Sequence, residues 1–152
     1  MAQAKTPTGG KYRSTRGRLS ERVDTFRHRI ELAASAEGPF RGTYALVDAG
    51  SAFTWVPARI LRGELGLTPF DQYKFVMVNG EQVKRDRAEA VIRLDGRVLH
   101  IICVFGEDKD QTLLGAYTLE GFALSVDPVR KRLVSLPVLP AAVDEEPEGG
   151  TP

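Results

Sequence analysis

Two turn dipeptides divide the middle of the sequence into short β-prone runs, and this pattern constrains the fold most. Asn79-Gly80 stands between residues 74–78 and 82–94, and Asp95-Gly96 leads into the apolar run 98–105. Asn-Gly or Asp-Gly between β-prone runs is a strong hairpin signal. With the flanking segments we count about seven to nine short strands and one or two short helices, which predicts an all-β barrel or sandwich.

Length and charge limit the class of function. The chain has 152 residues, enough for one domain, and its 21 basic and 20 acidic residues give a net charge of +1. This balance excludes a strongly basic nucleic-acid binder as the default. The charges are uneven, so we expect a basic disordered arm over 1–22, a β-barrel domain over 23–137 and an acidic disordered tail over 138–152. Nucleic-acid binding through the arm is the weakest alternative.

The remaining composition argues against several kinds of site. No apolar run approaches the ~18 residues of a membrane span, and no signal peptide is evident, so we expect a cytoplasmic protein without membrane contact. The single cysteine, Cys103, excludes an intramolecular disulfide and lies in an apolar run, where we expect a buried side chain. His28 and His100 have no metal-ligand partner at useful spacing, so we do not expect them to bind a metal, and no organic cofactor is implied either.

One acidic residue occupies an unusual position. The apolar residues 44–47 lead directly into Asp48, which is followed by the small residues Ala49, Gly50 and Ser51. A carboxylate at the end of a buried strand is costly unless it is paired or used, and glycine allows the backbone to approach another group closely. Asp48 is therefore a candidate catalytic acid. The alternative is a turn aspartate in an unrelated β-domain.

Residues 43–137 resemble the retropepsin-like aspartic proteases, specifically their small bacterial and archaeal members. The resemblance rests on an ordered set of motifs that covers most of the chain. These are Leu46-Val47-Asp48-Ala49-Gly50-Ser51, then Thr54, Pro57 and Leu65-Gly66-Leu67, a hairpin over 76–83, Leu113-Leu114-Gly115 before a short helix, and a closing hairpin over 127–134. The helix at 57–66 is one residue longer than is usual in the family, which predicts a local adjustment.

The resemblance implies a fold and a mechanism. The fold is a small closed β-barrel of the acid-protease type with one or two short helices. The activity is that of an aspartic endopeptidase, in which one carboxylate acts on a water while a second, sharing its proton, bonds the peptide carbonyl. Because the chain has one such turn on an apolar strand, the site requires a homodimer with Asp48 from each subunit. The substrate is an extended peptide or protein with apolar side chains beside the scissile bond.

The same resemblance assigns roles to three further segments. The active-site loop comprises Ala49, Gly50 and Ser51. The flap that covers the substrate comprises Met77, Val78, Asn79 and Gly80. The loop behind the active site comprises Leu113, Leu114 and Gly115.

Ala49 departs from the family pattern. The family has Thr or Ser there, and its hydroxyl bonds across the dimer axis; an alanine methyl cannot do so. The missing hydrogen bond predicts a weaker dimer and lower activity. It also favours the alternative of a non-catalytic peptide-binding or dimerisation module on the same fold.

Overall fold

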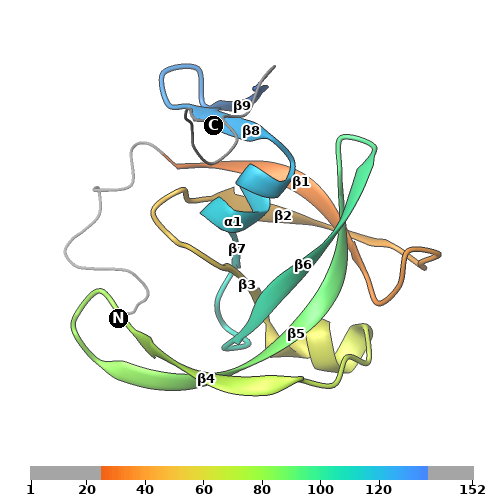
Figure 1. Cartoon of the computed structure of the whole chain (residues 1–152), viewed down its shortest axis with the longest axis vertical. Coiled ribbons are helices and arrows are strands. Elements are labelled where there is room, and N and C mark those ends of the chain that lie inside the picture. Colours follow the sequence, from red (N-terminus) through yellow and green to blue (C-terminus); the bar gives the residue numbers. More distant parts are fainter. Residues whose placement is uncertain (1–24, 137–152) are drawn as a thin grey trace, which may run out of the picture.

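Strand β1 (Phe26–Ala33) pairs with two strands, and this double pairing closes the sheet. It runs antiparallel to β2 (Arg41–Val47), and its residues 31–33 also face residues 91–93 of β5 (Gln82–Leu94). In the computed structural model, which describes residues 25–136, six strands form a closed barrel in the order β1-β2-β7-β3-β6-β5 (Figure 1). The other three are β3 (Thr54–Pro57), β6 (Arg97–Gly106) and β7 (Thr112–Leu114). The prediction of an all-β barrel with short helices is confirmed, and the sandwich alternative is not.

The barrel interior is filled by alternate residues of its strands. In β1, Ile30 and Leu32 are buried whereas Arg29 and Glu31 face outward. Cys103 in β6 is fully buried, as expected, and burial raises the pKa of its thiol to about 12 because the thiolate would lose its hydration. The period-2 pattern of the sequence thus fixes which face of each strand enters the core.

Strand β5 belongs to two parts of the molecule. Its residues 82–87 pair with β4 (Asp71–Val76), and its residues 87–94 pair with β6. Because β4 lies at the edge of the sheet and pairs with β5, the β4–β5 hairpin projects from the barrel wall (Figure 1). Gly80, with φ of +89°, closes its tip, and the Gly80 N–H donates to the Met77 carbonyl at 2.8 Å. This is a turn with a left-handed glycine, in keeping with the hairpin predicted at Asn79-Gly80.

Two short helices complete the part of the chain that the structure describes. The first, η2 (Arg59–Glu64), is a π-helical turn in which Leu65 N–H donates to the Ile60 carbonyl at 2.8 Å. The extra residue expected in this helix is accommodated by this wider turn. Pro57 was expected to open the helix, but it is the last residue of β3. The second helix is α1 (Ala116–Gly121), and the hairpin of β8 (Leu124–Asp127) and β9 (Arg132–Ser135) follows it.

The predicted arm 1–22 and tail 138–152 lie outside the described residues. Within residues 25–136, neither helix has the length and apolar character that a bilayer crossing demands.

Candidate functional site

Asp48 follows the last residue of β2, and backbone groups hold it on both sides. Its own N–H donates to the Leu114 carbonyl at 3.0 Å, which extends the parallel pairing of β2 with β7 by one step. The Gly50 N–H donates to Oδ1 of Asp48 at 3.0 Å, and the Ser51 N–H donates to the Asp48 carbonyl at 3.1 Å. Asp48 is half-buried while Ala49 and Gly50 are exposed. A tight turn therefore fixes a carboxylate at the surface of the barrel.

Thr54 ties three elements together beneath this turn. Its Oγ1 accepts a hydrogen bond from the Gly115 N–H at 3.0 Å and lies 2.7 Å from Oγ1 of Thr118 in α1. Both threonine side chains are buried, with relative exposures of 1% and 2%. Buried hydroxyls need partners, and each of these supplies one for the other. The network thus links β3, the end of β7 and α1.

Gly115 makes the closest backbone approach in the site. A Cβ at this position would lie 2.3 Å from the carbonyl oxygen of Phe53 and 2.8 Å from that of Ser51. Both carbonyls also accept hydrogen bonds. Ser51 Oγ donates to the Phe53 carbonyl at 2.9 Å, and the Ala116 N–H donates to the Ser51 carbonyl at 2.7 Å. Only glycine fits where two backbones touch in this way. The structure therefore places Leu114 and Gly115 directly behind the Asp48 turn.

Aromatic rings connect the Asp48 loop to the β4–β5 hairpin. Phe53 packs edge to face against Phe75 of β4, with ring centroids 5.8 Å apart, and against Tyr117 of α1 at 5.2 Å. Phe75 also contacts Trp55 at 5.2 Å and Tyr73 at 5.5 Å. The sequence reasoning missed this cluster. Tyr73 and Phe75 are two residues apart on one strand and share a face, which is a signal that was available.

The four predicted flap residues lie at the tip of the hairpin. Met77 is half-buried, Val78 is 80% exposed, and Asn79 and Gly80 are exposed. Their hydrogen bonds stay within the hairpin; Oδ1 of Asn79 accepts from the Glu81 N–H at 2.9 Å. Figure 1 shows the hairpin tip and the β2–β3 connection on the same side of the barrel. The contact between these two segments is made close to the hairpin tip, where Phe53 packs against Phe75 near the end of β4.

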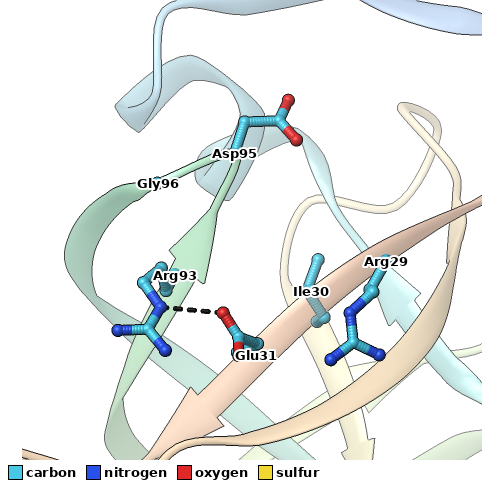
Figure 2. A pocket seen from close by; sticks show the side chains of 6 residues that line it. All are labelled: Arg29, Ile30, Glu31, Arg93, Asp95 and Gly96. Atoms are coloured by element: carbon cyan, nitrogen blue, oxygen red, sulfur yellow. Dashed lines mark hydrogen bonds and ion pairs between the residues drawn. The ribbon is translucent and has the colours of Figure 1, made fainter.

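Two surface hollows in the described chain lie away from this site. One, of about 220 Å³, is lined by Arg29, Ile30, Glu31, Arg93, Asp95 and Gly96. Figure 2 shows Arg93 paired there with Glu31 across β5 and β1. The other, of about 390 Å³, includes Glu37, Glu89 and His100. Neither includes a residue of the Asp48 turn or the hairpin tip. Within residues 25–136, no group of three His, Cys, Asp or Glu side chains is placed to hold a metal ion.

Comparisons with known proteins find similarity of fold. No family model and no curated protein matches the chain. The simian foamy virus protease is 18% identical over 62% of this chain and 92% of its own, with a TM-score of 0.46. A retropepsin-like aspartic protease from Rickettsia conorii is 23% identical over 68% of this chain and 87% of its own, with a TM-score of 0.44. A Legionella pneumophila protein of unknown function is 16% identical over 68% and 91%, with a TM-score of 0.45.

Proposed function

We propose that two copies of this chain form an aspartic endopeptidase, in which the two Asp48 carboxylates share one site. The observation that carries the proposal is the construction of the Asp48 turn. A carboxylate stands at the end of a buried strand, its Oδ1 accepts from the Gly50 N–H, and the buried Thr54 network supports the turn from below. Burying the polar groups of this network costs free energy, and a surface turn with a purely structural role does not need such support.

The chemistry requires the second copy. Two carboxylates a few ångströms apart cannot both ionise, so the pair holds one proton. The ionised carboxylate takes a proton from a water, whose oxygen attacks the peptide carbonyl carbon. The protonated carboxyl donates to the carbonyl oxygen. The carbon–nitrogen bond then breaks as the amine receives a proton, and the products are a free carboxylate and a free amine. A two-fold axis beside Asp48 supplies both partners from one sequence.

The substrate in this proposal is an extended peptide that lies between the Asp48 pair and the hairpin tips. An extended chain bonds to strand edges through its backbone, so side-chain preference comes from what lines the cleft. Met77 and Val78 at the tip, with the ring of Phe53, provide apolar contacts. We therefore expect large apolar side chains next to the scissile bond.

Ala49 supports the alternative of a non-catalytic module on the same fold. It is exposed beside Asp48 and offers a methyl group where a hydroxyl would reach a second copy. A dimer without that hydrogen bond is weaker, and the two carboxylates are held less firmly. The two functions differ in one respect, which is whether Asp48 is needed for chemistry or only for the shape of the turn.

The test is cleavage of a diverse peptide library between about pH 4 and pH 7, with products identified by mass spectrometry. Asp48→Asn keeps the size of the side chain and removes its acid–base chemistry. The matched control is Asp95→Asn, because Asp95 also lies in a turn that contains a glycine and is exposed. We expect cleavage by the parent and the control, none by Asp48→Asn, and faster cleavage by Ala49→Thr. Peptide binding without cleavage by any variant, Ala49→Thr included, would support the binding module instead.

A further inference from the structure

We propose that Arg87 is a positioning residue, which holds the base of the β4–β5 hairpin against the loop that follows Asp48. The inference rests on the proposed function, since it concerns how the hairpin tip meets the substrate. Arg87 lies outside every motif on which the resemblance to the aspartic proteases rests. Its role follows from the contacts of its guanidinium group.

Arg87 occupies the point where β5 leaves the barrel. It is the last residue of β5 that pairs with β4, opposite Asp71, and the first that pairs with β6, opposite Val104. Its carbonyl also accepts from the Phe70 N–H at 2.8 Å, one residue before β4 begins. Any change in the angle between the hairpin and the barrel wall therefore has its pivot at this residue.

The guanidinium group contacts both parts that meet at the pivot. Its Nε and Nη2 donate to the two carboxylate oxygens of Asp71, at 2.9 and 2.6 Å, in a two-pronged ion pair. The same group lies 4.3 Å from the ring centroid of Tyr73 in β4 and 5.5 Å from that of Phe53 in the Asp48 loop. The side chain is only 14% exposed. A planar cation that pairs with a carboxylate and stacks on rings favours one geometry strongly.

The contact with Phe53 reaches the candidate site because the backbone of Phe53 is itself fixed. The Phe53 carbonyl accepts from Ser51 Oγ and lies against Gly115. The ring of Phe53 then meets Phe75 of the hairpin on one side and Arg87 on another. These contacts fix the base of the hairpin relative to the turn that carries Asp48. The position of the hairpin tip relative to Asp48 therefore depends on them.

This arrangement predicts a particular kinetic signature. The hairpin tip contacts the substrate in the ground state and in the transition state alike, so a loose hairpin weakens uniform binding. Such a loss raises KM and leaves kcat nearly unchanged. A substitution that merely unfolds part of the population does the opposite, because fewer active molecules lower the apparent kcat at constant KM.

The experiment compares Arg87→Met with Arg93→Met in the full chain. Arg93 is the matched control: it lies on the same strand, and its Nε donates to Glu31 at 2.7 Å (Figure 2). Its guanidinium group also stacks on the ring of Phe40, 4.0 Å from the ring centroid. It differs in facing β1, away from the hairpin. Hydrogen exchange of backbone amides is measured for both variants, and KM and kcat are measured with a peptide that the parent cleaves.

We expect Arg87→Met to speed exchange about fivefold over residues 71–76 and 82–86, and to raise KM about fivefold with kcat within about twofold. Arg93→Met changes neither the hydrogen exchange of the hairpin nor KM and kcat. Arg87→Lys, which keeps the charge but not the fork, behaves like Arg87→Met in weaker form and replaces it if that variant does not fold. Unchanged exchange, exchange that rises evenly over the barrel, or a fall in kcat at constant KM overturns the proposal. If the parent and Ala49→Thr cleave no peptide, the proposed activity fails, while the exchange comparison still decides the role of Arg87.

Discussion

The shape of the candidate site depends most on the hydrogen bonds of the Thr54 hydroxyl group. Thr54→Val keeps the side-chain volume and removes Oγ1. Two buried groups then lose their partner: the Gly115 N–H, which donated at 3.0 Å, and Oγ1 of Thr118, which lay 2.7 Å away. The variant thus isolates hydrogen bonding from packing, because the added methyl group occupies the space of the lost oxygen.

The expected cost follows from the two stranded groups. A buried donor or acceptor left without a partner costs about 1–3 kcal/mol, so stranding two of them lowers the free energy of unfolding of Thr54→Val by about 2–6 kcal/mol. Thr118→Val removes one partner and leaves the Gly115 bond, so it costs about 1 kcal/mol. In the double variant the Thr118 hydroxyl is no longer stranded. The double variant strands only the Gly115 N–H, so it is destabilised by about 1–3 kcal/mol, which is less than Thr54→Val alone and less than the sum of the two single changes.

Urea unfolding followed by tryptophan fluorescence measures these differences. The chain has one tryptophan, Trp55, which is adjacent to Thr54 and packs against Phe75. All variants are compared at one protein concentration, so that any association contributes equally. A Thr54→Val variant within about 0.5 kcal/mol of the parent, or strictly additive single changes, would refute the reasoning.

Three further predictions concern other parts of the barrel. Gly115→Ala forces a Cβ to within 2.3 Å of a backbone oxygen and destabilises by about 1–3 kcal/mol or more, whereas Gly63→Ala, where the added Cβ meets nothing within 4 Å, does not destabilise; urea unfolding compares them. Burial raises the pKa of the Cys103 thiol to about 12, so a thiol reagent at pH 8 labels it only after denaturant is added, and rapid labelling of the native protein would show the barrel to be open. The hydrogen bonds from Arg87 hold the pKa of Asp71 below its ordinary value of 3.8, so this carboxylate stabilises the hairpin fully above about pH 4 and loses that effect as the pH falls through the lowered pKa; hydrogen exchange of the hairpin accelerates there, but shows no such step in Asp71→Asn.

Local signals in the sequence predicted the elements that depend on few neighbouring residues. Asp95 and Gly96 both adopt positive φ, at 51° and 85°, as an Asp-Gly hairpin turn requires. In β1, apolar and charged residues alternate in keeping with the burial of Ile30 and Leu32, and the apolar run around Cys103 predicted its burial. These features need only the preferences of turn residues and the two-residue period of a strand.

The contacts that build the site are long-range, and no local period encodes them. Thr54 and Thr118 are 64 residues apart, yet they share one hydrogen bond. The sequence singled out Thr54 but not Thr118, because a threonine in a short helix has no distinguishing pattern. Arg87 is likewise one of several charged residues in β5, and no local pattern distinguishes it. Its significance comes from the stacking of Phe53 and Tyr73 on it, which requires the hairpin to fold over the loop after Asp48.

The π-helical turn η2 illustrates a partial success. The resemblance predicted one residue more than usual in this helix, and the structure absorbs it in a wider turn that ends at Leu65. The predicted start of the helix, at Pro57, was wrong by two residues, because Pro57 continues the parallel pairing of β3 with β6. Proline suits a first helical turn and a strand end alike, so its preference did not decide between them.

The central claim is that Asp48 from each of two copies makes one active site, and subunit mixing tests it most directly. Parent chain and Asp48→Asn chain are mixed at constant total protein, allowed to exchange, and assayed with a cleaved peptide. If both carboxylates are needed, the rate follows the square of the parent fraction, so an equal mixture has about one quarter of the parent rate. A rate of about one half, in simple proportion to the parent fraction, would show that each chain works alone and would contradict the account.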